Sequence, residues 1–442
     1  MQELAGQRVL VLGLGVSGRS AANFCAARGA RVVAADECPA DALDLTDLDA
    51  GIDARLGTPF PDAGDFDLVV PSPGVPPQRY RANARRVWGD IELAFRALPI
   101  PIVAVTGTNG KSTVTRLVEA GLRAAGLRAQ AAGNVGEAAL ELVGAPLDVA
   151  VLEVSSFQLE TIETFRPQVA VVLNITPDHL DRHGGFEAYR EAKARILENQ
   201  QPNDVAVIDF ESAPARELAA RARGRVIGLG NRVTLDESAW LDGDEAVLTA
   251  PGAAPVRVTL QIQLPGHHNL ENALAALATV WALGCDLERA AAGIAAFTGL
   301  PHRMERVARV AGVSYVNDSK ATNPAAAQRA LEGCDARVIW IAGGRAKGLT
   351  FDVLTETAAR RARAAVLIGE SAGALKHTLA GRIPTHAAAS LDAAVRAAAQ
   401  LAQPGDVVLL APACASQDQF RDFAARGECF RAAVHALEET PG

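Results

Sequence analysis

The sequence lacks the features that mark secreted, membrane or nucleic-acid-binding proteins. Its six cysteines are scattered without a Cys-x-x-Cys pair, so we expect reduced thiols and no metal cluster. No apolar run approaches the roughly 20 residues needed to span a bilayer. The first residues carry no basic segment followed by an apolar stretch. A formal net charge of -8 argues against general nucleic-acid binding. These absences predict a cytoplasmic protein without a membrane or nucleic-acid partner.

Short β-branched runs alternate with alanine-rich stretches along the whole chain, which predicts an α/β fold with largely parallel sheets. A length of 442 residues exceeds what one hydrophobic core usually serves. Breaks rich in proline and glycine near 99–101 and 299–301 predict three domains. We expect a Rossmann-like domain at 1–97, a phosphate-loop ATPase-type domain with a mostly parallel sheet at 98–299, and a Rossmann-like domain at 300–442.

The apolar pattern also places individual elements. Buried strands are expected at 8–12, 31–35, 102–105, 149–152, 169–173, 337–341, 365–368 and 407–410, and helices at about 17–28, 91–97 and 269–283. The segment 211–258 has weaker periodicity and several turn residues, so shorter strands and loops are expected there.

The segment 106–113 reads Thr-Gly-Thr-Asn-Gly-Lys-Ser-Thr and lies between an apolar strand and a helix. Backbone N–H groups in such a loop point at phosphate oxygens, and the helix dipole favours negative charge. Lys111 would neutralise the terminal phosphates and Ser112 would reach Mg²⁺. The strict phosphate-loop pattern has a glycine where this chain has Val105, so this is a shortened variant. The alternative is a glycine-rich turn followed by chance by a lysine.

A second glycine-rich turn, Gly-Leu-Gly-Val-Ser-Gly at 13–18, also joins a strand to a helix, and Asp36 ends the next strand. This pattern is typical of dinucleotide binding and, alone, would suggest a nicotinamide or flavin enzyme. The same geometry could hold the diphosphate of a UDP-sugar or serve only as a structural turn. The motif therefore predicts a nucleotide without identifying it.

Polar clusters follow two later strands of the central segment. Glu153 could hold the Mg²⁺ that bridges nucleotide phosphates, and the alternative for this cluster is helix capping by Ser155 or Ser156. His179, in Thr-Pro-Asp-His-Leu-Asp-Arg-His at 176–183, could bind a second divalent cation or be structural. From spacing alone, Lys193 is expected to be a solvated helix lysine.

Further polar groups begin a helix or follow strands of the last segment. Asn269 and Asn272 are three residues apart on one helix face and could present amides to a purine, although Asn269 could instead cap the helix. Arg303 suits a forked grip on phosphate or carboxylate. Candidates to contact ATP or a carboxylate after the later strands are Asp318, Lys320, Lys347, Ser416 and Phe423. Individually, such residues are surface charges as often as ligands.

Together these motifs resemble the Mur ligase family over essentially the whole chain. The run Gly107–Ser112 is similar to the family's ATP loop, including the missing first glycine. The segments Asn317–Asn323 and Pro412–Ser416 resemble the branch that adds D-glutamate, and the acceptor signature of ligases that add diaminopimelate or lysine is not found. A sibling ligase, an oxidoreductase and a non-catalytic nucleotide-binding protein remain the alternative hypotheses.

The resemblance implies that ATP, UDP-N-acetylmuramoyl-L-alanine and D-glutamate react through an acyl phosphate, in peptidoglycan precursor synthesis, on a monomeric enzyme. It assigns catalysis to Lys111, Glu153, His179 and Lys193, and two Mg²⁺ ions to Ser112, Glu153, His179 and a carbamylated Lys193. It assigns ATP to Gly107, Thr108, Asn109, Gly110, Lys111, Ser112, Thr113, Asn269, Asn272, Arg303, Asp318 and Lys320. The uridine diphosphate falls to Val16, Ser17, Asp36, Glu37, Ser72, Pro73 and Gly74. The muramoyl-alanine end falls to Asn134, Ser155 and His179, and D-glutamate to Thr322, Lys347, Ser416 and Phe423.

Overall fold

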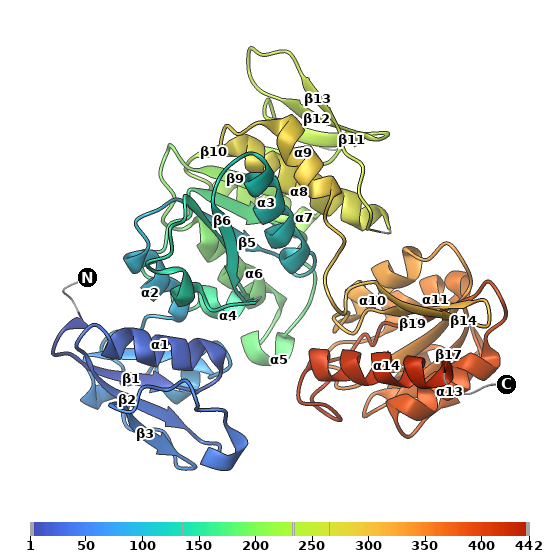
Figure 1. Cartoon of the computed structure of the whole chain (residues 1–442), viewed down its shortest axis with the longest axis horizontal. Helices are drawn as coiled ribbons and strands as arrows, with labels where there is room; N and C mark the ends of the chain where they lie inside the picture. Colours follow the sequence, from blue (N-terminus) through green and yellow to red (C-terminus); the bar gives the residue numbers. More distant parts are fainter. Residues whose placement is uncertain (1–3, 135, 232, 234, 265, 439–442) are drawn as a thin grey trace. The chain divides into compact units, whose positions relative to one another are not determined.

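The structure, a computed structural model, describes residues 4–134, 136–231, 233, 235–264 and 266–438. The chain folds into two compact units, and Figure 1 labels their helices and strands. The first unit comprises Met1–Ile175, Glu187–Leu260 and Ala273–Ala295, and the second comprises Thr176–Phe186, Gln261–Asn272 and Ala296–Gly442. No helix in the described ranges is both long enough and apolar enough to cross a membrane.

The first unit begins with a four-stranded parallel sheet in the order β3-β2-β1-β4. Its strands are β1 (Arg8–Leu12), β2 (Arg31–Asp36), β3 (Asp53–Leu56) and β4 (Leu68–Pro71). Helix α1 (Val16–Ala26) follows β1, and α2 (Asp90–Ala97) follows the segment after β4. Short 3-10 turns are η2 (Ala40–Ala42), η3 (Ala63–Asp65) and η4 (Pro77–Arg79). The strand expected at 8–12 is confirmed, and the helix expected at about 17–28 starts one residue earlier and ends at Ala26.

The same unit continues with a nine-stranded sheet in the order β13-β12-β11-β10-β9-β8-β5-β7-β6. The strands are β5 (Ile102–Thr106), β6 (Ala129–Gly133), β7 (Val149–Glu153), β8 (Val169–Val172), β9 (Val205–Asp209), β10 (Arg225–Leu229), β11 (Ser238–Asp242), β12 (Glu245–Thr249) and β13 (Val256–Thr259). Every residue of β5, β7 and β8 is buried, because strands of a parallel sheet are covered on both faces. Within the described part of this nine-stranded sheet, only the pairs β11–β12 and β12–β13 are antiparallel. The four short strands β10–β13 confirm the shorter strands expected at 211–258, although the segment also holds a helical turn at Ala213–Arg216 and a 3-10 turn at Glu217–Arg221.

Helices and short turns cover this sheet (Figure 1). They are α3 (Lys111–Ala124), α4 (Ser156–Leu159), α6 (Phe186–Ala194), α7 (Ala213–Arg216), α8 (His267–Ala282) and α9 (Leu287–Ala295), with η5 (Ala139–Leu142), η6 (Arg195–Leu197) and η7 (Glu217–Arg221). Gly293 of α9 allows a close approach to α3, because a Cβ there would lie 2.5 Å from the Cβ of Ala124.

The second unit contains a six-stranded sheet in the order β14-β15-β19-β16-β17-β18, of which only β14–β15 is antiparallel within the described part of the chain. The strands are β14 (Glu305–Val310), β15 (Val313–Asn317), β16 (Val338–Gly343), β17 (Ala362–Ile368), β18 (Thr385–Ala387) and β19 (Val407–Leu410). The helices are α5 (Leu180–His183), α10 (Pro324–Glu332), α11 (Thr355–Arg361), α12 (Ala372–Thr378), α13 (Leu391–Leu401) and α14 (Phe423–Glu438), with η8 (Asp352–Leu354).

Alternation along β16 builds two cores in this second unit. Trp340 belongs to a cluster with Leu331 of α10, whereas its neighbour Ile341 belongs to a cluster with Val395 of α13 and Phe430 of α14. Successive side chains of a strand point to opposite faces, so helices cover both sides of the sheet. The predicted α/β class with mostly parallel sheets is confirmed, while the domain bounds 1–97, 98–299 and 300–442 stay predictions.

Candidate functional site: a phosphate loop and a second cluster of ligand loops

Two glycines give the loop after β5 its backbone path. Gly107 and Gly110 have φ angles of 150° and 87°, and Gly110 directly precedes the 14-residue helix α3. A Cβ on Gly107 would lie 2.7 Å from the Cβ of Leu173, just beyond β8. Since that loop ends at the N-terminus of α3, the helix dipole favours an anion there. Ser112 and Thr113 lie buried in the first turn of the helix.

Two lysine ammonium groups converge on this loop. Lys111 Nζ donates to the carbonyl oxygens of Gly107 (3.0 Å) and Thr108 (2.8 Å). Lys193 Nζ, from α6, donates to the same Gly107 oxygen at 2.7 Å. The side chain of Lys193 is almost fully buried, so the expectation from spacing that it is solvated is wrong. The helix face that carries Lys193 packs against the loop, which a pattern along α6 alone does not reveal.

The loop is held by two residues that the sequence did not identify. Asn174, just after β8, accepts a hydrogen bond from Asn109 N at its Oδ1 and donates from Nδ2 to Asn109 O, both at 3.2 Å. Its carbonyl oxygen also accepts from Thr108 N at 2.7 Å. The hydroxyls of Tyr189 and Thr108 lie 3.0 Å apart. The hydrogen bonds of the Thr108 and Asn109 amides therefore shape the loop. The sequence could have indicated Asn174 through its position just after the carboxyl end of β8.

Glu153 ends β7, the neighbour of β5, so its carboxylate lies at the same sheet edge as the phosphate loop. The carboxylate is buried, and Oε1 accepts a hydrogen bond of 2.7 Å from Nδ2 of Asn134. Ser155 caps α4 in a capping box with Gln158. The capping alternative is thus confirmed for Ser155, and its substrate contact stays a prediction.

The glycine-rich turn after β1 has the close packing that its pattern requires. A Cβ on Gly18 would lie 1.8 Å from the carbonyl oxygen of Gly13, and Ser72 Oγ donates to that oxygen at 2.7 Å. Asp36 accepts from the backbone N–H groups of Leu14 (2.7 Å) and Cys38 (2.9 Å). Asp36 therefore uses both carboxylate oxygens to hold the turn and its own loop.

The other residues predicted for uridine diphosphate lie around this turn. Val16 is 61% exposed at the start of α1, and Glu37 forms an ion pair with Arg79 at the surface. Ser17 donates to the buried carboxylate of Asp90, whose pKa is raised by burial against the lowering effect of Gln158 and Ser17. Ser72, Pro73 and Gly74 follow β4, the other neighbour of β1.

In the second unit, three loops follow the adjacent strands β15, β19 and β16 and meet at their carboxyl edge. Backbone hydrogen bonds join the first two loops, since Asp318 N donates to Leu410 O (2.8 Å) and Ala413 N donates to Ala321 O (2.9 Å). The third loop is joined to the second through Arg345 N and Ala415 O at 3.0 Å. The sequence-predicted residues Asp318, Lys320, Thr322, Lys347 and Ser416 are carried by these loops.

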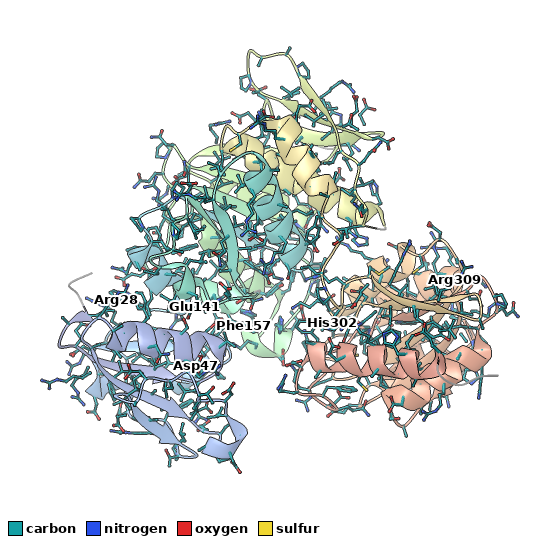
Figure 2. All side chains as sticks on the ribbon, viewed as in Figure 1. Arg28, Asp47, Glu141, Phe157, His302 and Arg309 are labelled. Atoms are coloured by element: carbon teal, nitrogen blue, oxygen red, sulfur yellow. The ribbon has the colours of Figure 1, made fainter. Side chains whose placement is uncertain are left out.

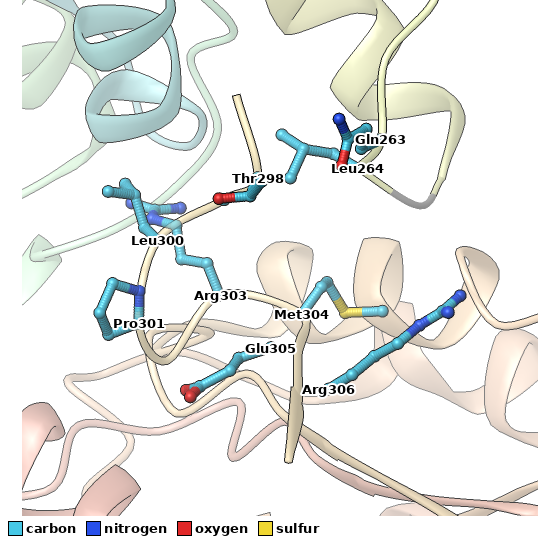
Figure 3. Close-up of a pocket in the computed structure, with 10 residues that line it drawn as sticks. Gln263, Leu264, Thr298, Leu300, Pro301, Arg303, Met304, Glu305 and Arg306 are labelled. Carbon is cyan, nitrogen blue, oxygen red and sulfur yellow. The ribbon is translucent and has the colours of Figure 1, made fainter. Parts of the chain in front are cut away.

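Asp318 is buried beside the loop that carries Arg303. Its Oδ1 accepts from Met304 N at 3.4 Å. Burial raises the pKa of Asp318 to about 6, against the opposing charge of Arg303. Arg303 lines a cavity of about 350 Å³ together with Gln263 and Thr298 (Figure 3). His302, labelled in Figure 2, directly precedes Arg303, and its Nδ1 lies 3.0 Å from Asn317 Nδ2.

Two further predicted ligands lie side by side. Lys320 Nζ is 3.8 Å from the centre of the Phe423 ring, a cation–π contact. Ser416 is buried at the end of the β19 loop, and Thr322 is partly exposed after Lys320. The structure therefore brings Lys320 and Phe423 together from segments about 100 positions apart in the chain.

Lys347 has a left-handed backbone conformation with φ of 54°. Its ammonium forms an ion pair of 3.0 Å with Asp178, which also accepts from Asn323 Nδ2 at 3.1 Å. Burial opposes ionisation of Asp178, but Lys347 and His179 lower the pKa of that carboxyl below its usual value. Lys347 thus pairs with a carboxylate of the chain itself, and its contact with a substrate carboxylate stays a prediction.

His179 and the two asparagines have definite local positions. His179 precedes α5 with φ of 52°, and its Nε2 lies 3.7 Å from Asp178 Oδ2. Asn272 Nδ2 donates to Asn269 Oδ1 at 3.2 Å, so the two amides share a helix face as predicted. The alternative that Asn269 caps the helix is wrong, because α8 begins at His267.

A loop of this kind, placed between a buried parallel strand and a helix and neighboured by two lysines, defines a phosphate-loop nucleotide-binding protein of the α/β class. Sequence comparison identifies the family to which the chain belongs within that class of proteins. The Mur ligase middle domain matches residues 105–280, and the Mur ligase glutamate ligase domain matches residues 302–414. The chain belongs to the Mur ligase family, as the motifs predicted.

Relatives match the chain along its length. It is 44% identical to the UDP-N-acetylmuramoylalanine–D-glutamate ligase of Pelotomaculum thermopropionicum, over 99% of this chain and 100% of that protein. It is 46% identical to the enzyme of the same name from Anaeromyxobacter dehalogenans, over 97% of both chains. The crystal structure of MurF from Acinetobacter baumannii has a TM-score of 0.64 at 20% identity, covering 100% of this chain and 92% of that one. At 20% sequence identity, the similarity to this MurF structure shows a shared fold and nothing more.

Proposed function

We propose that this protein joins D-glutamate to UDP-N-acetylmuramoyl-L-alanine at the expense of ATP, through an acyl phosphate, in the synthesis of peptidoglycan precursors. The observation that carries the proposal is full-length identity of 44% and 46% to ligases of that name. The phosphate loop would bind ATP, and the loops that follow β15, β19 and β16 in the second unit would bind the amino acid. The proposed reaction needs both kinds of site.

The first step requires a phosphate loop. A carboxylate is a poor electrophile, so the γ-phosphoryl group of ATP is transferred to the carboxylate of the alanyl residue. Negative charge spreads over the phosphoryl oxygens during this transfer. The N-terminus of α3 and the ammonium of Lys111 disperse that charge. The Lys111 ammonium donates to two carbonyl oxygens of this loop, so it lies beside the place proposed for the phosphates.

Magnesium fits the groups at this edge of the sheet. The Ser112 hydroxyl and the Glu153 carboxylate are hard oxygen donors of the type that Mg²⁺ prefers, and Asn134 fixes the orientation of Glu153. When bound, the ion neutralises phosphate charge. We further propose that a second ion is held by His179 and a carbamylated Lys193. A carbamate nitrogen keeps one hydrogen, so it could still donate to Gly107 O.

The second step is attack of the D-glutamate amine on the acyl phosphate, with phosphate leaving from a tetrahedral intermediate. Lys347, Thr322, Ser416 and Phe423 are proposed to hold D-glutamate. The ammonium of Lys347 already pairs with a carboxylate in the protein. Fixing the amine near the acyl phosphate would replace a bimolecular encounter by a positioned one.

The remaining predicted contacts are part of the same proposal. Asn269, Asn272, Arg303, Asp318 and Lys320 would bind the adenosine and phosphates of ATP. Val16, Ser17, Asp36, Glu37 and Ser72–Gly74 would surround the uridine diphosphate, with Asn134, Ser155 and His179 near the muramoyl-alanine end. We also propose a monomer that works in the cytoplasm, and analytical ultracentrifugation checks the monomer.

An amino-acid panel tests the proposed reaction. Purified protein is incubated with ATP, Mg²⁺ and UDP-N-acetylmuramoyl-L-alanine, and ADP release is followed with D-glutamate, L-glutamate, L-alanine or L-lysine. We expect release with D-glutamate and a rate lower by at least about a hundredfold with the other three, because a chiral site with charged contacts rejects poor fits strongly. Release driven by L-alanine or L-lysine would identify a different ligase, and release with none would reject the proposal.

A further inference from the structure

One large cation lies buried in the second unit outside the set of residues considered above. Arg426, in the first turn of α14, is 1% exposed. Its three hydrogen bonds go to neutral oxygens: Nε to Ser319 Oγ (3.0 Å), Nη2 to Ser319 O (2.9 Å) and Nη1 to Cys414 O (3.2 Å). Within the described residues, its guanidinium forms no ion pair. A buried charge of this kind is costly unless a counter-charge arrives.

Two other arginines of the protein pair with a carboxylate, which is the usual way to stabilise a guanidinium group that is partly buried. Arg363 grips Asp406 with Nε and Nη2 at 2.9 and 3.1 Å. Arg166 grips Asp204 in the same two-pronged manner at 2.7 and 2.9 Å. Both of these guanidinium groups are more exposed than that of Arg426. The most deeply buried of the three is therefore the one without a carboxylate partner.

The guanidinium of Arg426 stays charged at neutral pH, although the carboxylate of Asp418 acts on it through its charge. Burial lowers its pKa to about 10, which still leaves the guanidinium protonated. Burial raises the pKa of the adjacent Cys414 thiol to about 11, so that group contributes no negative charge. The carboxylate of Asp418 is partly exposed and accepts from Glu370 N at 3.0 Å. Among the described residues, Arg426 therefore has a carboxylate that acts on it through its charge but none to which it donates a hydrogen bond.

The guanidinium also joins three of the four segments that carry the proposed D-glutamate contacts, all but that of Lys347. Ser319 lies between Asp318 and Lys320, three residues before Thr322. Cys414 lies two residues before Ser416. The hydroxyl of Ser319, which accepts from Arg426, donates to Phe423 O at 2.7 Å. A single side chain thus fixes the β15 loop, the β19 loop and the start of α14 to one another.

The neighbouring residue holds α14 in place independently. A Cβ on Gly427 would lie 2.2 Å from Nδ1 of His302, and Gly427 O accepts from Asn317 Nδ2 at 3.1 Å. Because glycine permits this contact, the helix can start directly against the end of β15. The position of Arg426 is therefore over-determined by its surroundings, and its charge is pre-organised toward the loops.

We propose that Arg426 is a positioning residue for the acidic amino-acid substrate: it holds the loops of Thr322, Ser416 and Phe423 and supplies the buried positive charge that a substrate carboxylate neutralises. The inference rests on the proposed function and deepens it. It predicts a larger effect on the amino acid than on ATP, because three of the four D-glutamate contacts lie on these segments, whereas the phosphate loop belongs to the other unit and only Asp318 and Lys320 of the β15 loop are proposed to contact ATP.

The test compares Arg426→Met, which keeps a long apolar side chain, with Arg426→Lys, which keeps the charge. Initial rates of ADP release give KM for D-glutamate, for ATP and for UDP-N-acetylmuramoyl-L-alanine. We expect KM for D-glutamate to rise about tenfold or more in Arg426→Met and by an intermediate factor in Arg426→Lys, since charge-assisted contacts are about twice as strong as neutral ones. KM for UDP-N-acetylmuramoyl-L-alanine should change less than about twofold, and KM for ATP should rise by a clearly smaller factor than KM for D-glutamate. Arg396→Met, at an exposed position of α13, is the matched control.

The outcomes separate the inference from its premise. A wild-type protein without D-glutamate-dependent ADP release rejects the proposed function. An active wild type whose Arg426→Met variant keeps its KM for D-glutamate, or whose three KM values rise together, overturns the role of Arg426. Equal impairment of the Lys and Met variants overturns the part played by charge. If Arg426→Met fails to fold in thermal melts, Arg426→Lys decides, and an unchanged KM for D-glutamate overturns the proposal.

Discussion

The ammonium groups of Lys111 and Lys193 donate to one carbonyl oxygen, that of Gly107, at 3.0 and 2.7 Å. The two lysines are 82 positions apart in the chain and come from different helices, α3 and α6. One lies in the loop motif itself and is partly exposed, whereas the other is buried. The same carbonyl oxygen therefore accepts from one lysine that is partly exposed, Lys111, and from one that is fixed by packing, Lys193.

Lys193 is predicted to act as a carbamate in the working enzyme. Lys193→Ala should lower kcat by at least about a hundredfold, because a ligand oxygen of the second ion is lost. Lys193→Arg should be equally impaired, since arginine keeps a cation that does not form a carbamate. Acetate or formate should restore part of the activity of Lys193→Ala by supplying a carboxylate. ADP release measures these effects.

Lys376→Ala, at an exposed position near the end of α12, is the control for this series and should behave as wild type. Full activity of Lys193→Ala without added acid would exclude the carbamate. Full activity of Lys193→Arg would show instead that the cation itself is what the loop needs.

Lys111 is predicted to be indispensable for phosphoryl transfer. Lys111→Ala should reduce kcat by roughly a thousandfold, because the charge next to the terminal phosphates is removed. The thermal midpoint should change little, since the hydrogen bonds of the Lys111 ammonium to Gly107 O and Thr108 O stay within its own loop. Parallel melts and ADP-release assays separate these effects. Near-normal turnover in a folded Lys111→Ala protein would reject the assignment of the loop.

The phosphate loop could be found from the sequence because all of its signals are contiguous. A buried strand, glycines at 107 and 110, and the helix that starts at Lys111 follow one another without a break. The glycine-rich turn after β1 was recognised for the same reason. The alternation of strands and helices likewise predicted the α/β class, since each apolar run is long enough to identify one element.

Other groups were hidden because packing between distant segments decides their role. Lys193 reads as an ordinary helix lysine until α6 lies against Gly107, 86 positions earlier. Arg426 looks like one more basic residue in a polar run, and its burial depends on the contact between α14 and the end of β15. The pattern of residues along a single helix does not reveal such contacts between distant segments.

Asn174 is predicted to set the shape of the phosphate loop. Asn174→Ala removes two side-chain hydrogen bonds to Asn109, each worth about 1 kcal/mol. We expect KM for ATP to rise about tenfold, with a smaller change in KM for D-glutamate, because the loop contacts phosphates. Asn174→Asp is the informative partner, since it keeps the acceptor for Asn109 N but loses the donor to Asn109 O. Its carboxylate would lie against Asn109 O and beside the phosphates, so KM for ATP should rise at least as much as in Asn174→Ala. Equal KM values for ATP in all three proteins would contradict the role.

Asp318 is predicted to make stability depend on pH. Burial raises its pKa from 3.8 to about 6 in the folded protein. The folded state therefore binds more protons than the unfolded state between these values, and the contribution of Asp318 to stability, fully present below pH 3.8, is lost as pH rises through about 6. Asp318→Asn keeps an acceptor for Met304 N and does not ionise. The variant should gain stability relative to wild type as pH rises from 4 to 7, by on the order of 3 kcal/mol.

Thermal or urea melts of both proteins at several pH values from 4 to 8 measure this difference. A second buried group titrates in the same window, because burial lowers the pKa of His268 to about 4, with a smaller contribution from Arg329. Its effect has the opposite sign, since the unfolded state then binds the extra proton. His268 is present in wild type and variant alike, so it cancels when one is subtracted from the other. A difference between the two proteins that stays constant from pH 4 to 7 would place the pKa of Asp318 at its ordinary value, and the buried carboxyl would then be fully stabilised by Arg303.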